Sequence, residues 1–214
     1  MKKIHLFIAT ILFFFVFISS SDASQTNVAP LNLLRLPMTN QATNFTCGVA
    51  AAQSVLGYFG DEYAESSLYR HLKPSKEDGT TYHKIANFLK SNGYSVEIFI
   101  GQKQGSGMTL KQLKSKIESG IPVIVLIQAY AEKPKIDYAK DWDDGHYVVA
   151  IGYDEKNIYF MDPSSFGHYA FIPQKEFLVR WHDVDKQERL WNFGMAVTKK
   201  VAKKYDANKI DYLM

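Results

Sequence analysis

Residues 145–163 read GHYVVAIGYDEKNIYFMDP, a stretch in which two mainly apolar runs are separated by a short polar segment. Apolar and aromatic residues dominate 146–153 and 158–162, and the turn-forming sequence Asp-Glu-Lys-Asn lies between them. Two such runs around a short polar turn are typical of a β-hairpin. Upstream, the continuous apolar run 122–130 predicts another strand, which we expect to be buried on both faces.

The rest of the second half is also predicted to be mainly sheet, with strands at 169–172 and 193–198 and one helix over 174–181. Helical patterns are concentrated in the first half of the chain, together with one strand at 95–100. We expect these helices at 47–59, 63–71, 82–90 and 110–119, the last with Thr109 as N-cap and Gly120 after its end. Helices first and antiparallel strands afterwards indicate an α+β domain.

The N-terminus has the pattern of a secretory signal peptide over residues 1–23. Two lysines precede an almost wholly apolar run, and Ser21 and Ala23 suit cleavage before Ser24. The apolar run is shorter than the roughly 18 residues that a spanning helix needs. We therefore expect an exported protein, periplasmic or secreted, with no stable membrane insertion after cleavage.

The remaining residues are enough for a single packed domain. We expect an extended lead-in over 24–40, a domain over 41–200 and a charged C-terminal tail over 201–214. The hydrophobic fraction of 46% is that of a globular protein, and the net charge of +3 is too small to indicate a nucleic-acid partner.

Cys47 is the one cysteine of the chain. It cannot form an intrachain disulfide, and a free thiol in an oxidising compartment suggests reactivity. A polar, turn-prone stretch precedes it and an alanine-rich helical pattern follows, so the sulfur should lie at a helix N-terminus, where unpaired N–H groups favour negative charge. Gln41 lies six residues upstream, and His146 and Asp162 follow in the hairpin. A cysteine, a histidine and an aspartate in that order, with an oxyanion donor, form a thiol-hydrolase constellation.

This hypothesis makes a structural demand on the hairpin. A two-residue loop at 155–156 would pair Asp162 with Val149 and leave His146 on the opposite face of the sheet. A three-residue loop, or a bulge, shifts the register by one and can place Asp162 opposite Val148, on the face of His146. The triad hypothesis therefore predicts an odd loop or a bulge between the two strands.

Each of these residues also has an ordinary structural interpretation. A lone cysteine is most often a small buried hydrophobe, and an aspartate before a proline is a common turn signal. The acidic residues Asp141, Asp143 and Asp144 do not have the spacing of a calcium loop, so we expect a solvated loop at the rim of a cleft. The other histidines show no metal-ligand spacing, and we expect neither a metal nor a cofactor.

The ordered set of motifs is a more specific indicator of a protein family than any one of its residues. Gln41, the CGVA motif at 47–50, GHYVVAIGYD at 145–154 and IYFMDP at 158–163 occur in an order that resembles the bacteriocin-processing, double-glycine cysteine peptidase family of the papain-like group. The resemblance implies a papain-like fold, in which a helical half bearing the cysteine packs on an antiparallel sheet bearing the histidine and aspartate. It also implies that Cys47, His146 and Asp162 form the catalytic triad and that Gln41 is the oxyanion-hole glutamine.

Well-known members of that family are fused to a transporter and cleave leader peptides after Gly-Gly on the cytosolic side. This chain combines the peptidase motifs with an export signal and shows no transporter or ATPase pattern. We therefore expect a stand-alone exported cysteine peptidase that acts on peptide or protein substrates, at bonds next to small residues such as glycine. Two alternatives stay open: acyl transfer from the thioester to an amine, and a catalytically silent domain that binds peptide or envelope material.

Overall fold

The computed structural model describes residues 33–132, 136–200, 205–210 and 212. The predicted signal peptide and the first part of the lead-in lie outside these residues, as does much of the predicted tail. Internal contacts divide the chain into residues 1–30 and 31–214, and every element below belongs to the second unit. None of the helices in the described part of the chain is long and apolar enough to cross a membrane.

The elements follow the predicted order. The helices are α1 (Cys47–Tyr58), α2 (Glu65–Leu72), α3 (Tyr82–Ser91), α4 (Leu110–Glu118) and α5 (Gln174–Arg180). The strands are β1 (Tyr94–Gly101), β2 (Val123–Gln128), β3 (Gly145–Tyr153), β4 (Asn157–Met161), β5 (Ala170–Pro173), β6 (His182–Asp185) and β7 (Glu188–Lys199). The α+β prediction is confirmed.

The sequence analysis missed β6 and made β7 too short. The two strands form a hairpin in which Asp185 pairs with Glu188, and Lys186 in its turn has a positive φ of 57°. Because β6 reads His-Asp-Val-Asp, it lacks the apolar run from which the other strands were recognised.

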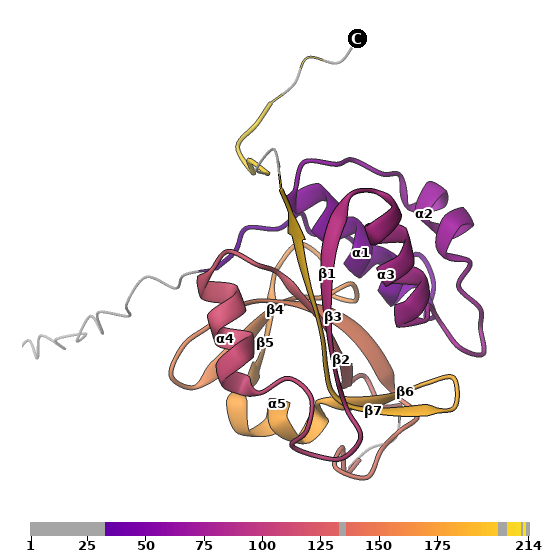
Figure 1. Ribbon diagram of the computed structural model, residues 1–214, viewed down its shortest axis with the longest axis vertical. Coiled ribbons are helices and arrows are strands. Elements are labelled where there is room, and N and C mark those ends of the chain that lie inside the picture. Colours follow the sequence, from indigo (N-terminus) through magenta and orange to yellow (C-terminus); the bar gives the residue numbers. More distant parts are fainter. Residues whose placement is uncertain (1–32, 133–135, 201–204, 211, 213–214) are drawn as a thin grey trace, which may run out of the picture. The chain divides into compact units, whose positions relative to one another are not determined.

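All strand pairs are antiparallel, in the order β1-β7-β2-β3-β4-β5, with β6 paired to β7 (Figure 1). Helices α1, α2 and α3 pack on one face of this sheet, and α4 and α5 pack on the other (Figure 1). Successive side chains of β2 alternate between the two cores: Ile124 and Leu126 face α1–α3, whereas Val125 faces α4 and α5. The prediction that this strand is buried on both faces is confirmed.

Local sequence explains where the helices begin and end. Thr109 caps α4 in a capping box, accepting the backbone N–H of Gln112 while the Gln112 side chain accepts the N–H of Thr109. Gly120 follows this helix with a positive φ of 74°, as expected for the residue after a helix C-terminus. The described part of the lead-in forms no helix or strand. It is fixed at Leu36, whose backbone N–H and C=O both form hydrogen bonds with the hydroxyl of Tyr169.

The hairpin of β3 and β4 contains the irregularity that the triad hypothesis requires. From the turn outward, the pairs are Tyr153–Ile158, Gly152–Tyr159, Ala150–Phe160 and Val149–Met161. The first two have the register of a two-residue loop, and Ile151 is then left over as a bulge. Extending the shifted register by one residue places Asp162 opposite Val148, on the same face as His146. The prediction of an odd loop or a bulge is confirmed, and the bulge supplies the shift.

Candidate active site

Cys47 is the first residue of α1, as predicted. The preceding turn is closed by Thr46, whose hydroxyl accepts the N–H of Thr43 at 3.0 Å and whose carbonyl accepts the N–H of Ala50. The side chain of Thr46 therefore does not cap the helix. A Cβ on Gly48 would lie 2.8 Å from the Cβ of Thr80, so the close approach of α1 to its neighbours requires a glycine after the cysteine.

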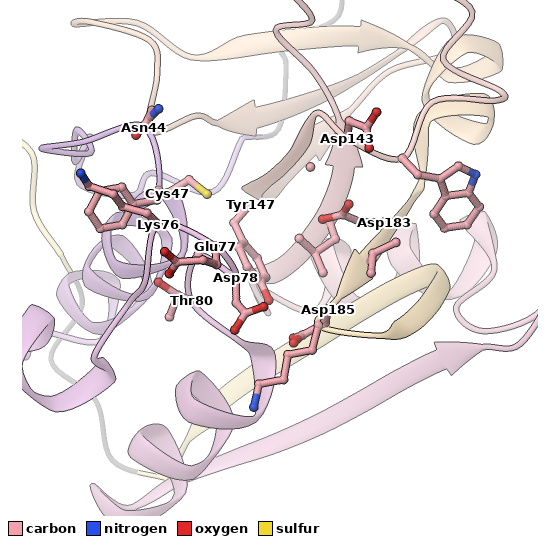
Figure 2. Close-up of a pocket in the computed structure, with 17 residues that line it drawn as sticks. Asn44, Cys47, Lys76, Glu77, Asp78, Thr80, Asp143, Tyr147, Asp183 and Asp185 are labelled. Carbon is pink, nitrogen blue, oxygen red and sulfur yellow. The ribbon is translucent and has the colours of Figure 1, made fainter.

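Cys47 is 7% exposed and lines a cavity of about 450 Å³. Figure 2 shows its sulfur pointing from the helical side of this cavity toward the side that carries Tyr147 and Asp183. The thiol is also a neighbour of the His146 imidazole, whose pKa it helps to raise. The cysteine is thus buried, but it faces open space and a titratable partner.

His146 and Asp162 form the other half of the arrangement. The Nε2 atom of His146, on β3, lies 2.7 Å from Oδ1 of Asp162, directly after β4. Each residue is only 6% exposed. Because an ionised carboxylate only accepts hydrogen bonds, Nε2 carries the proton in this contact and Nδ1 is free to face the thiol. The structure therefore brings together Cys47, His146 and Asp162.

The electrostatics of this pair depend on the contacts of both groups. Burial by itself opposes a charged imidazole, but the hydrogen bonds with Asp162 and Cys47 outweigh it and raise the pKa of His146. Burial likewise acts against the charged form of Asp162. This effect is outweighed by the hydrogen bond and charge of His146 and by the hydrogen bond from Tyr130, so the pKa of Asp162 is lowered. At neutral pH the structure favours an imidazolium held between a carboxylate and the sulfur.

Gln41 lies close to Asp162 in the fold but uses its amide elsewhere. Its Nε2 donates to the carbonyl of Thr43 at 2.9 Å, and its Oε1 accepts from the hydroxyl of Ser164 at 3.2 Å. Its backbone N–H donates to the carbonyl of Pro163. These contacts join the end of the lead-in to the segment after Asp162, and the oxyanion role of Gln41 stays a prediction.

The lining of the cavity that contains Cys47 is acidic. Its carboxylates outnumber its lysines: they are Glu77, Asp78, Asp143, Asp183 and Asp185, against Lys76 and Lys186 (Figure 2). Asp143, from the predicted acidic loop, lines the cavity and is exposed as expected, whereas its neighbours Asp141, Trp142 and Asp144 are half-buried.

Asp183 was missed by the sequence analysis because it lies in the unpredicted strand β6. It is 7% exposed, and its Oδ1 accepts from Nε2 of Gln128 at 2.9 Å. A Cβ on Gly145 would collide with its carboxylate, which explains the glycine that precedes His146. Burial, together with the nearby charges of Asp185 and Asp141, raises the pKa of Asp183 to about 7.

We expect Asp183→Asn to stabilise the fold near pH 8 and to have little effect near pH 4. The folded protein holds the Asp183 proton up to about pH 7, whereas the unfolded chain releases it near pH 4. Between these values the folded state binds more protons, so stability falls as pH rises, by at most about 4 kcal/mol. Urea midpoints from pH 4 to pH 8 measure this loss, which the variant should lack. Asp143→Asn is the control, since an exposed carboxylate is solvated by water, and parallel curves for Asp183→Asn and the wild type would contradict the prediction.

A second cavity, of about 350 Å³, is lined by His146 and Asp162. Its wall is mainly apolar and aromatic and includes Tyr130, Tyr138 and Phe171. Within the described residues, no three histidine, cysteine, aspartate or glutamate side chains are grouped as a metal site.

Comparisons with known proteins place this geometry in a family. The fold is similar to a C39-like peptidase from Bacillus anthracis (TM-score 0.59, 16% identity, 81% of this chain and 98% of that one). It is also similar to the peptidase domain of Streptococcus ComA, a bifunctional ABC transporter of a quorum-sensing pathway (TM-score 0.55, 17% identity, 78% and 99%). A third similar structure is the double-glycine-motif protease of an AMS/PCAT transporter, solved with its leader peptide (TM-score 0.50, 17% identity, 78% and 93%).

These likenesses confirm the expected papain-like architecture of helices and antiparallel sheet. No curated protein matches the chain in sequence. A sequence profile of the Peptidase_C39 like family, however, matches residues 33–189, well over half of the chain. The chain therefore belongs to the Peptidase_C39 like family.

Proposed function

We propose that this protein is an exported cysteine peptidase that hydrolyses peptide bonds, including bonds after small residues such as glycine. The observation that carries the proposal is the position of His146, which is buried, hydrogen-bonded to Asp162 and under the electrostatic influence of Cys47. Membership of a peptidase family supports the same class of reaction.

In this mechanism the sulfur of Cys47 attacks the carbonyl carbon of the scissile bond. The thiol proton resides on His146, which is stabilised as an imidazolium by Asp162, and is then given to the leaving amine. Water next attacks the thioester, with neutral His146 accepting its proton, and the carboxylic acid and the free thiol are released. Asp162 keeps its charge throughout and holds the imidazole in one tautomer.

The negative charge on the substrate oxygen needs donors near the sulfur. The backbone N–H of Cys47, at the N-terminus of α1, is one such donor, and the helix dipole has the favourable sign there. The side-chain amide of Gln41 is the second donor in the proposal. Its N–H bonds the carbonyl of Thr43 in the structure, so the substrate oxygen has to replace that carbonyl as acceptor.

A peptide substrate is supported by one of the similar structures, the protease of an AMS/PCAT transporter, which was solved with a leader peptide. For this chain the proposal is limited to peptides or proteins met after export. Export itself rests on the predicted signal peptide: N-terminal sequencing that finds Ser24 as the first residue supports it, and a retained Met1 contradicts it.

The direct test of the proposal is the pH dependence of iodoacetamide alkylation of Cys47. Because His146 is held as an imidazolium, we expect fast alkylation already at pH 6, where an ordinary thiol is almost entirely protonated. His146→Ala should slow the reaction at pH 6 by about tenfold or more and have a smaller effect at pH 9. His168→Ala is the matched control, since His168 is exposed and bonds only the carbonyl of Tyr169.

Equal alkylation profiles for His146→Ala and the wild type would make Cys47 a passive residue, and a peptide-binding domain would then be the better description. If the pair is reactive, incubation of a peptide with an added amine distinguishes hydrolysis from acyl transfer. Hydrolysis gives the free carboxylate, whereas transfer gives the new amide.

A further inference from the structure

Tyr130 contacts both members of the His146–Asp162 pair. It follows the end of β2, and its ring packs edge-on against the imidazole of His146, with centroids 5.3 Å apart and an interplanar angle of 88°. Its hydroxyl donates a hydrogen bond to Oδ2 of Asp162. Nothing in the local sequence marks it, because it is the last residue of a long apolar run.

The hydroxyl of Tyr130 completes the set of donors around the Asp162 carboxylate. Oδ1 accepts from Nε2 of His146 at 2.7 Å and from the backbone N–H of Ser164 at 2.9 Å. Oδ2 accepts from Tyr130 and from the hydroxyl of Ser165 at 3.1 Å. With donors on both oxygens, the carboxylate cannot rotate without losing hydrogen bonds, and Oδ1 stays directed at His146.

The ring of Tyr130 is the exposed neighbour of this buried pair. His146 and Asp162 are each 6% exposed, whereas Tyr130 is 58% exposed and lines the same cavity of about 350 Å³. Tyr130 is therefore the outer layer over a buried hydrogen bond. Excluding water from such a bond strengthens it, since the local dielectric constant is lower than that of water.

The backbone at Tyr130 is held in an unfavourable conformation. Its φ is 62°, in the left-handed region that a bulky residue rarely adopts. The adjacent N–H of Ala129 donates to the carbonyl of Asp144, which closes the base of the loop between β2 and β3. A strained residue persists only where its surroundings fix it, and such residues are concentrated at functional sites.

We propose that Tyr130 is a positioning residue: its hydroxyl fixes the Asp162 carboxylate, and its ring shields the His146–Asp162 hydrogen bond from water. It acts through Asp162 and His146 and takes no part in the reaction at the sulfur. Its effect on Cys47 rests on the proposed function, whereas its effect on the His146–Asp162 pair does not.

The test compares Tyr130→Phe, which keeps the ring and loses the hydroxyl, with Tyr130→Ala, which loses both. The first readout is the proton resonance of the His146 Nε2–H, which a shielded hydrogen bond protects from exchange with water. We expect this resonance in the wild type, a weakened one in Tyr130→Phe and its loss in Tyr130→Ala. The second readout is alkylation of Cys47 at pH 6, which should slow about fivefold in Tyr130→Phe and further in Tyr130→Ala.

Tyr159→Phe is the matched control, because the hydroxyl of Tyr159 also donates to an aspartate, Asp154, away from the pair. It should behave as the wild type in both readouts. The proposal is overturned if Tyr130→Phe and Tyr130→Ala leave both readouts unchanged, and Tyr130→Phe alone decides the role of the hydroxyl if the alanine variant does not fold. If the wild type alkylates only at high pH, the proposed function fails, but the resonance still decides whether Tyr130 protects the pair.

Discussion

Cys47→Ala is expected to abolish peptide hydrolysis, with a loss in rate on the order of 10⁶. Cys47 is the one cysteine of the chain, so no second thiol can replace it. The sulfur lines the cavity, so its removal takes away the proposed nucleophile and costs the core only one small side-chain atom. The measurement is the appearance of new N-termini, by mass spectrometry, from a peptide mixture that contains glycine-rich sequences.

The control for this variant is its thermal midpoint. Alanine suits the alanine-rich start of α1, so we expect the midpoint to stay close to that of the wild type. Hydrolysis that survives in folded Cys47→Ala would refute the assignment of the nucleophile. If the wild type releases new N-termini only when an added amine is present to take up the acyl group, the assignment to hydrolysis is replaced by acyl transfer.

Asp162→Asn is expected to lower the rate of hydrolysis by about 10⁴, by analogy with the aspartate of serine-protease triads. An amide has no negative charge with which to stabilise the imidazolium of His146. Its NH₂ group can also donate to Nε2, which moves the imidazole proton to Nδ1, the atom that should receive the thiol proton. The measurement is kcat on a substrate that the wild type cleaves, with the His146 ring titrated in parallel by NMR.

Asp154→Asn is the matched control, since Asp154 lies in the same hairpin and also accepts from backbone N–H groups and from a tyrosine. We expect this change to loosen the β3–β4 turn and to leave kcat nearly unchanged. A similar fall in kcat for both variants would mean that hairpin stability, and not the His146–Asp162 contact, controls the rate.

Local signals in the sequence were enough to predict most of the fold. The capping residues of α4, the alanine-rich α1 and the two-sided apolar run of β2 each depend on neighbours within a few residues, so propensity and periodicity identify them. The relation between His146 and Asp162 could also be derived from the sequence, because strand alternation requires a shift of one residue. Whether loop length or a bulge would supply that shift could not be derived, since either one satisfies the alternation.

The α+β class, the family resemblance and the candidate set Cys47, His146 and Asp162 all follow from the order of residues along the chain. Three contacts could be learned only from the folded chain: Tyr130 with the His146–Asp162 pair, Asp183 with Gly145, and the amide of Gln41 with the carbonyl of Thr43. The first two contacts join segments that are far apart in the chain and meet only when the sheet and its loops have packed. The third depends on the side-chain rotamer of Gln41, which is set by that packing. Periodicity describes only which face a residue takes, so the sequence could name the candidate residues of the site but not the side chains that contact them.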